Sequence, residues 1–254
     1  MEKVNVSYMD NNYPLYILPQ DGRRSLILRD KGTQKGKVAT WYQIVQKLNV
    51  DTVYDIGANY GEFLLPVLQR NVKTVVYEPN AKVFECLSRS VNESISDPSY
   101  ITLVNAAVGD SNYTTTLYIP DSSGNASLEK SCVVHPEQIK PQEVEVHDIV
   151  RILEGSKDFA MKLDIEGTEY KVLDRIRQND DSYNSYCIMF EFNKLSRRQT
   201  EIIEEFLDGK QVAGISRNEV ELTNDSFFTY TKAASLAKLQ GAHDVIVCKN
   251  VNWG

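Results

Sequence analysis

Apolar and polar positions along the chain follow two periods, which together predict alternating strands and helices. Short runs rich in valine, isoleucine and tyrosine are typical of strands, and apolar residues three and four apart are typical of helices. The expected strands are Thr52–Ile56, Thr74–Tyr77, Ile101–Val104, Phe159–Asp164, Cys187–Phe192, Gln211–Ile215 and Asp244–Cys248, and the expected helices are Glu62–Gln69, Ala81–Asn92, Thr168–Arg177 and Arg197–Leu207. This order is typical of a single sheet whose strands are connected by crossover helices. We therefore predict an α/β fold with a doubly wound, Rossmann-like sheet of seven strands, the last antiparallel.

Two segments depart from this alternation. Within residues 1–50, Tyr13–Leu18 and Ser25–Arg29 suggest a hairpin, and Val38–Leu48 has the spacing of an amphipathic helix. We interpret residues 1–50 as a lid-like part of the same domain as residues 51–254. At about residues 109–150 the pattern changes to the β-type runs Thr114–Ile119 and Val144–Ile149. We interpret this region as an insertion after the third strand, formed by a β-hairpin and a loop.

Composition limits the classes of function. A chain of 254 residues with 42% apolar residues can bury one large core, so we expect one domain. The formal charge of −7 argues against a nucleic-acid-binding protein, because phosphate binding needs a basic surface. No apolar run is long enough to span a bilayer, and the first residues lack a signal-peptide pattern, so we expect a soluble, cytoplasmic protein. The four cysteines form no CxxC pair and are expected to be buried or half-buried thiols.

The strongest candidate for chemistry is VYDIGANYGEF at residues 53–63, followed by TVVYEPN at residues 74–80. A strand, a glycine turn, a helix and a second strand ending in Glu78 form a nucleoside-binding βαβ pattern, whose acidic residue binds the ribose hydroxyls. The middle glycine of the dinucleotide pattern G-x-G-x-x-G is missing, and Asp55 beside the turn suits an ammonium and a sulfonium better than a pyrophosphate. The pattern favours S-adenosylmethionine over NAD. The alternative is a glycine turn that serves only helix–strand packing.

Acidic and amide residues end the predicted parallel strands, where ligands of doubly wound sheets bind. We assign Asp55 and Glu78 to the cofactor, and we expect Asn105 and Ala106 at the edge of its adenine. The remaining acidic residues are left for the acceptor, and they are Asp164 and Glu166 after the fourth strand and Glu191, close to Asn193, after the fifth.

The segment MKLDIEGTEYKVL places Lys162, Asp164 and Glu166 at alternate positions, so an extended strand would point all three side chains the same way. Methylation of a hydroxyl needs a group that accepts the proton, and Asp164 is our first choice of base. Glu166 could orient the acceptor or, with Asp164 and Glu191, ligate a divalent cation such as Mg²⁺. The alternative is a structural ion-pair cluster that includes Lys162.

Taken in order, these motifs resemble the FkbM-type family of S-adenosylmethionine-dependent O-methyltransferases. The resemblance runs from about Val53 to Asn193 and also rests on NAAVGD at residues 105–110, the pair Ser127-Leu128, VEVHDIV at residues 144–150 and MFEFN at residues 189–193. One departure is His147-Asp148-Ile149, where the family commonly has Asp-Asp-Leu.

The resemblance implies a class I methyltransferase fold and methyl transfer to a hydroxyl of a sugar, glycan, glycolipid, polyketide or similar secondary metabolite. The acceptor partner would then be a small molecule or a glycan. Carried over by position, the residues implied in cofactor binding are Asp55, Gly57, Ala58, Asn59, Gly61, Glu78, Pro79, Asn105, Ala106 and Ala107. Asp164 and Glu166 would mark the acceptor side.

The sequence argues against one other class of function and leaves two as alternatives. Asp164-Ile165-Glu166-Gly167 differs from the Asn- or Asp-Pro-Pro-aromatic step of amide and base N-methyltransferases, which argues against that class. An RNA ribose 2′-O-methyltransferase could use Lys162, Asp164 and Glu191, although the acidic balance weighs against RNA. A methyltransferase fold without activity, used as a binding module, is the non-enzymatic alternative.

Overall fold

Short β-favouring runs of this sequence form the centre of the molecule as one mixed sheet. The computed structural model describes residues 1–133, 139–192, 196–215, 222–232, 235–239, 241–251 and 253, so Asn193 lies outside the described residues. The strands of the sheet lie in the order β12-β11-β13-β10-β9-β3-β4-β5. Their bounds are β3 Thr52–Ile56, β4 Lys73–Tyr77, β5 Ile101–Val104, β9 Asp158–Leu163, β10 Ser185–Glu191, β11 Gln211–Ile215, β12 Phe228–Thr229 and β13 Asp244–Lys249.

The order and directions of these strands confirm the predicted fold class. β5, β4, β3, β9 and β10 are mutually parallel, and β13 runs antiparallel between β10 and β11. All seven strands predicted for this sheet are present, and the two-residue edge strand β12 is an addition. Parallel neighbours bring the carboxyl ends of β3, β4, β9 and β10 to one edge of the sheet, where a site can form.

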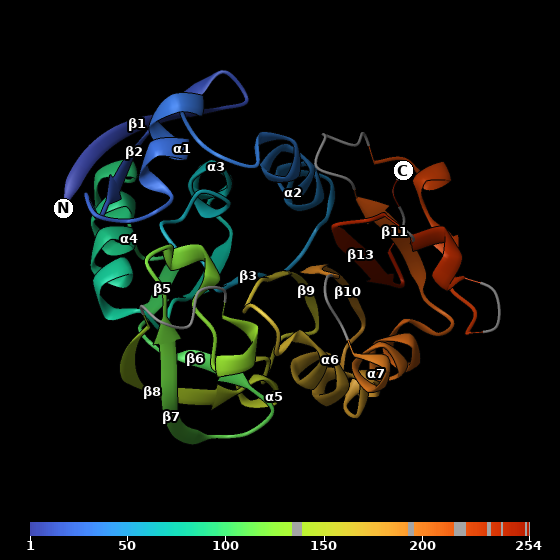
Figure 1. The fold of residues 1–254 in the computed structure, drawn as a ribbon. Helices are drawn as coiled ribbons and strands as arrows, with labels where there is room; N and C mark the ends of the chain where they lie inside the picture. The colour runs from blue at the N-terminus through green and yellow to red at the C-terminus, as the bar shows by residue number, and fades with distance from the viewer. Residues whose placement is uncertain are drawn as a thin grey trace.

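Helices cover both faces of the sheet (Figure 1). One face carries α2 Lys35–Lys47, the short α3 Leu64–Val67 and α4 Ala81–Ser94, and the other carries α5 Ile149–Ile152, α6 Glu169–Arg177 and α7 Arg197–Leu207. Successive residues of β3 pack on opposite faces of the sheet. Val53 belongs to the core under α2, α3 and α4, and Tyr54 belongs to the core under α5, α6 and α7. Asp55, the next residue after Tyr54, therefore points toward the face that carries α2 and α3.

The N-terminal segment corrects one prediction. The hairpin consists of β1 Glu2–Tyr8 and β2 Asn11–Ile17, and the predicted second strand, Ser25–Arg29, lies within helix α1 Arg24–Asp30. Both residues of the two-residue turn, Met9 and Asp10, have positive φ (45° and 62°), as a type I′ turn requires. Met-Asp is not a usual sequence for a type I′ turn, so the sequence pattern did not indicate a turn at these residues. The hairpin packs against α4, and the lid-like role of residues 1–50 stays a prediction.

Two other segments follow the predictions with changes. The insertion forms a separate sheet in the order β6-β8-β7, with β6 Ala107–Gly109, β7 Tyr113–Ile119 and β8 Lys140–Asp148. The antiparallel pairing of β7 with β8 confirms the predicted hairpin, whereas β6 was not expected. The predicted helix Glu62–Gln69 is shorter than expected, since α3 passes into a 3-10 turn at Leu68–Arg70. Among the described residues, no helix is long and apolar enough to cross a membrane.

Candidate active site

The loop after β3 is held against two neighbouring strands. The backbone N–H groups of Gly57 and Ala58 both donate to the carbonyl of Tyr77 at the end of β4, at 2.9 and 3.0 Å. Gly57 has a φ of +82°, and a Cβ placed there would lie 1.8 Å from the carbonyl oxygen of Asp164. Only glycine lets the backbone follow this path. The glycine motif therefore joins the carboxyl ends of β3, β4 and β9 into one surface.

Glu78 ends β4 and lies buried beside this loop. Its two carboxylate oxygens accept backbone hydrogen bonds from Asn59, at 2.9 Å, and from Asn80, at 2.8 Å. Burial raises the pKa of Glu78 to about 7, although these two backbone donors oppose the shift. Each carboxylate oxygen has a second lone pair, so the group can still accept hydrogen bonds from the two hydroxyls of a ribose.

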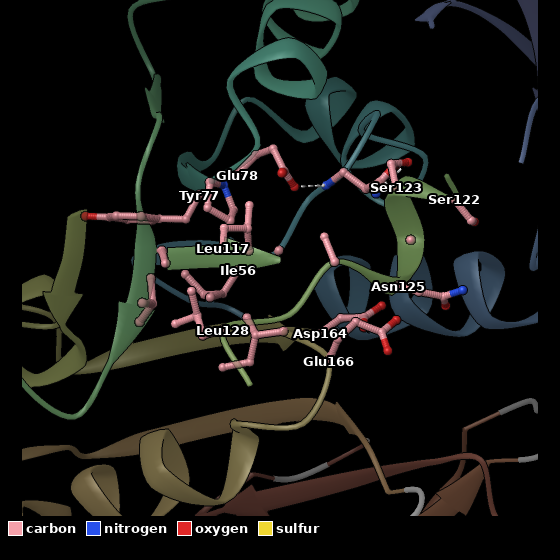
Figure 2. Close-up of a pocket in the computed structure, with 18 of the residues that line it drawn as sticks. Ile56, Tyr77, Glu78, Leu117, Ser122, Ser123, Asn125, Leu128, Asp164 and Glu166 are labelled. Carbon is pink, nitrogen blue, oxygen red and sulfur yellow. Dashed lines mark hydrogen bonds between the residues drawn. The ribbon is translucent and has the colours of Figure 1, made fainter. Parts of the chain in front are cut away.

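A cavity of about 250 Å³ opens between this carboxylate and the end of β9. Figure 2 shows Glu78 on one side of the cavity and the carboxylates of Asp164 and Glu166 on another. Ile56 and the apolar side chains of the insertion line the part between them, and Ser122 and Ser123 close one end. An apolar surface next to a buried carboxylate suits a nucleoside, because the base needs a flat apolar contact and the ribose needs acceptors. The lining residues from the insertion are Leu117, Ser122, Ser123, Gly124, Asn125, Ala126 and Leu128.

Asp55 is the clearest sign that a cationic group belongs here. Its side chain is 1% exposed, and neither carboxylate oxygen has a hydrogen-bond partner among the described residues. Burial raises the pKa of Asp55 to about 6, opposed by the charge of Lys162, its register neighbour on β9. A buried carboxylate without partners is costly. The residues present therefore fit S-adenosylmethionine, whose ammonium and sulfonium groups would compensate acidic neighbours.

Three carboxylates converge at the ends of β9 and β10. One carboxylate oxygen from each of Asp164, Glu166 and Glu191 lies within 4.8 Å of the other two. An extended strand was expected to bring these carboxylates together, but β9 ends at Leu163 and the chain turns after it. Glu166 has a φ of 57°, in the left-handed region, and it is this turn that carries its side chain back toward Asp164.

Two buried side chains hold this turn in place. Glu169 accepts backbone hydrogen bonds from Ile165 and Gly167, both at 2.9 Å, and Ser127 of the insertion donates its hydroxyl to the carbonyl of Glu166 at 2.7 Å. Glu169 is 3% exposed, and burial raises its pKa to about 7. Ser127 belongs to one of the sequence motifs, whereas no pattern in the sequence singled out Glu169. Both residues position the carboxylates without belonging to the cavity lining.

The charges of these groups differ strongly. Burial alone would raise the pKa of Asp164, but the charge of Lys162 and its hydrogen bond to Asp164 outweigh burial and lower that pKa. Burial together with the charges of Asp164 and Glu191 raises the pKa of Glu166 to about 9. Asp164 is therefore ionised at neutral pH while Glu166 holds a proton when no cation is bound.

A second cavity, of about 770 Å³, lies on the other side of the carboxylates. It shares Gln34, Asp164 and Glu166 with the first cavity, so the two spaces meet at these residues. Residues 1–50 were interpreted as lid-like, but no sequence pattern singled out the individual residues of this segment that form the wall of the second cavity. The residues lining this second cavity are Leu26, Asp30, Gly32, Thr33, Gln34, Lys35, Gly36, Lys37, Asp164, Glu166, Glu191, His243 and Asp244.

The predicted site residues divide into lining and supporting positions. Those that line the first cavity are Gly57, Asn59, Glu78, Pro79, Ala106, Ala107, Asp164 and Glu166. Those that do not line it are Asp55, Ala58, Gly61, Asn105, Lys162 and Glu191, and Glu191 lines the second cavity instead. The Asn105 amide donates to the carbonyls of Glu78 and Pro79, which fixes the turn after β4.

Several solved structures are similar to this chain. The chain matches a methyltransferase FkbM from Methylobacillus flagellatus KT with 14% identity and a TM-score of 0.47, over 78% of this chain and 43% of that one. A SAM-dependent methyltransferase from Agrobacterium tumefaciens matches with 9% identity and a TM-score of 0.50, over 98% and 70% of the two chains. An O-methyltransferase from Streptomyces achromogenes involved in tomaymycin synthesis matches with 8% identity and a TM-score of 0.47, over 89% and 84%. The chain thus spans less than half of the Methylobacillus structure.

The sheet order and the site at its edge define a methyltransferase of the Rossmann-like class, and the Agrobacterium structure shares this fold. The sequence model of the methyltransferase FkbM domain matches residues 55–211, which is more than half of the chain. The protein therefore belongs to the FkbM methyltransferase family, as the motifs predicted. No curated protein matches the chain in sequence.

Proposed function

We propose that this protein is an S-adenosylmethionine-dependent O-methyltransferase whose acceptor is a hydroxyl of a sugar, a glycan or a related secondary metabolite. The observation that carries the proposal is that the two cavities meet at Asp164 and Glu166. A methyltransferase needs a nucleoside site and an acceptor site that open onto one reacting point, because the methyl group moves in line from sulfur to oxygen.

The first cavity suits the cofactor. Glu78 would accept hydrogen bonds from the ribose hydroxyls, and Ile56, Val108 and Leu128 offer apolar contacts to the adenine. Asp55 would counter the positive charge of the methionine part. When bound, S-adenosylmethionine would supply a methyl group activated by the sulfonium. The residues of this chain would orient that group toward the shared wall.

The second cavity suits the acceptor, with Asp164 as base. Asp164 Oδ2 accepts a hydrogen bond from Lys162 at 2.9 Å, which leaves Oδ1 as the atom to receive a proton. In the proposed step Asp164 Oδ1 would accept the hydroxyl proton of the acceptor, whose oxygen would receive the methyl group while the electron pair of the broken carbon–sulfur bond stays on sulfur. Glu166 and Glu191 border the same cavity and would orient the acceptor.

A divalent cation such as Mg²⁺ is a second way to use the same carboxylates. Oxygen ligands from Asp164, Glu166 and Glu191 approach one another closely enough to share one ion. A cation there would displace the proton of Glu166, lower the pKa of an acceptor hydroxyl and orient it. Asp164 would then act as a ligand.

Titration calorimetry tests the cofactor part of the proposal. S-adenosylmethionine and NAD are titrated separately, each with and without Mg²⁺. Binding of the methyl donor alone supports the proposal, binding of NAD alone contradicts it, and binding of neither favours a methyltransferase fold that serves as a binding module.

Incubation with a panel of sugars, glycosides and polyhydroxylated metabolites tests the acceptor part. Mass spectrometry should detect one added methyl group on a hydroxyl, and a short RNA of mixed sequence is included as the competing acceptor. Methylation of the RNA ribose in place of the small molecules would contradict the assigned acceptor class.

A further inference from the structure

Arg23 joins the N-terminal segment to the wall of the cofactor cavity. It precedes α1 and reaches across to the loop after β3, where its Nη1 donates to Asn59 Oδ1 at 2.9 Å. Its Nη2 donates to Thr33 Oγ1 at 3.0 Å and forms an ion pair with Glu62. The side chain is 15% exposed and lines the first cavity. Among the described residues that line this cavity, Arg23 is the only cationic one.

A buried network fixes the direction of the guanidinium. Glu62, in the glycine motif, also accepts hydrogen bonds from the hydroxyl of Tyr8 at 2.6 Å and from the backbone N–H of Thr33 at 2.8 Å. On the opposite side, a Cβ on Gly124 of the insertion would lie 3.0 Å from Arg23 Cδ. The glycine leaves room for the stem of the arginine. Arg23 is thus held by the N-terminal segment, the glycine motif and the insertion together.

The guanidinium has more donors than these partners use. It carries five N–H donors, and the contacts to Asn59, Thr33 and Glu62 account for three of them. Nε and the second Nη1 hydrogen have no partner among the described residues and remain for a ligand in the cavity. Arginine keeps its charge at any working pH and binds carboxylates with two parallel hydrogen bonds.

We propose that Arg23 binds the carboxylate of the methionine part of the cofactor. The proposal rests on the proposed function, since it assumes that S-adenosylmethionine occupies the first cavity. That ligand combines two cationic groups with one carboxylate. Asp55, buried behind the cavity lining, would compensate the cations, and Arg23 in the lining would bind the anion. The N-terminal segment therefore completes the cofactor site, and Glu62, Thr33 and Tyr8 are positioning residues.

The test compares two ligands that differ only in that carboxylate, S-adenosylmethionine and its decarboxylated form. Calorimetry measures the affinity of each for the full chain, for Arg23→Gln and for Arg23→Lys. The full chain should bind the intact ligand at least about tenfold more tightly, because hydrogen bonds between a guanidinium and a carboxylate are stronger than those between neutral groups. Arg23→Gln should remove most of this preference while binding the decarboxylated form nearly as before, and Arg23→Lys should retain part of it.

If Arg23 had only a structural role, Arg23→Gln would lower the affinity for both ligands by the same factor. Arg24→Gln is the matched control, because Arg24 pairs with Glu2 at the surface and should change neither affinity. If Arg23→Gln does not fold, the affinities of the full chain and of Arg23→Lys still test the proposal. Equal affinity of the full chain for both ligands overturns it. Failure of the full chain to bind either ligand would instead overturn the proposed function.

Discussion

Lys162 Nζ donates to Asp164 Oδ2 at 2.9 Å, and the same nitrogen lies 4.4 Å from the centre of the Phe63 ring. The lysine is 5% exposed, so its charge acts through protein and is screened little by water. This pairing keeps Asp164 ionised in a place where burial alone would favour the protonated carboxyl. A buried base that stays ionised can accept a proton at neutral pH.

Asp164→Asn should lower turnover strongly and leave cofactor affinity nearly unchanged. The amide keeps the size of the side chain but cannot accept the proton, so we expect a loss of kcat of about 100-fold to 10,000-fold. Steady-state kinetics and calorimetry with S-adenosylmethionine measure the two effects. Asp110→Asn, at an exposed position, serves as the control and should behave like the unchanged protein. A large loss of cofactor affinity in Asp164→Asn would contradict the assignment of Asp164 to the acceptor.

Affinity for the nucleoside part should rise with pH. The pKa of Glu78 is raised to about 7, and ribose hydroxyls donate best to the ionised carboxylate, so the binding-competent fraction grows as pH rises from 6 to 8. Well below the pKa, each pH unit should change the affinity by up to about tenfold. Adenosine is the suitable probe, because it carries the ribose diol without the ammonium. Calorimetry of Glu78→Gln should show weaker, pH-independent binding, and a flat profile for the unchanged protein would contradict the role of Glu78.

A divalent cation should stabilise the protein if the three carboxylates bind one. Binding to the folded state at 100 times the dissociation constant adds about 2.7 kcal/mol to the free energy of unfolding, which raises Tm by several degrees. Thermal unfolding with and without Mg²⁺ measures the shift. Glu191→Gln should reduce it, whereas Glu154→Gln on the surface should not. An identical Tm in saturating Mg²⁺ would leave Asp164 as a base without a metal.

Gly57→Ala should destabilise the chain far more than Gly155→Ala. Both glycines have similar positive φ values, 82° and 85°, so the conformational cost of alanine is similar at both. A Cβ on Gly57 meets the Asp164 carbonyl, while a Cβ on Gly155 has nothing within 4 Å. We expect about 1 kcal/mol at Gly155 and at least about 2 kcal/mol more at Gly57. Urea unfolding of both variants measures the difference, and equal losses would contradict the close approach of the two strand ends.

Local patterns predicted most of the elements because their causes are local. Helix α7 begins at the predicted residue, since Ser196 and Gln199 form a capping box that the sequence contains. The strands β3 and β5 have the predicted bounds as well. The hairpin of β1 and β2 escaped prediction, because its turn residues, Met9 and Asp10, adopt positive φ without a glycine or asparagine to indicate it.

The glycine motif, the acidic strand ends and the membership in the FkbM methyltransferase family follow from the amino-acid sequence, because each depends on short segments or on their order. Which of these residues face a cavity depends on the three-dimensional fold. Asp55 and Lys162 lie buried behind the lining, and Arg23 reaches the cavity from a part of the chain that no motif marked. The reason is physical, since the position of a side chain at a strand end depends on turns and on segments far away in sequence.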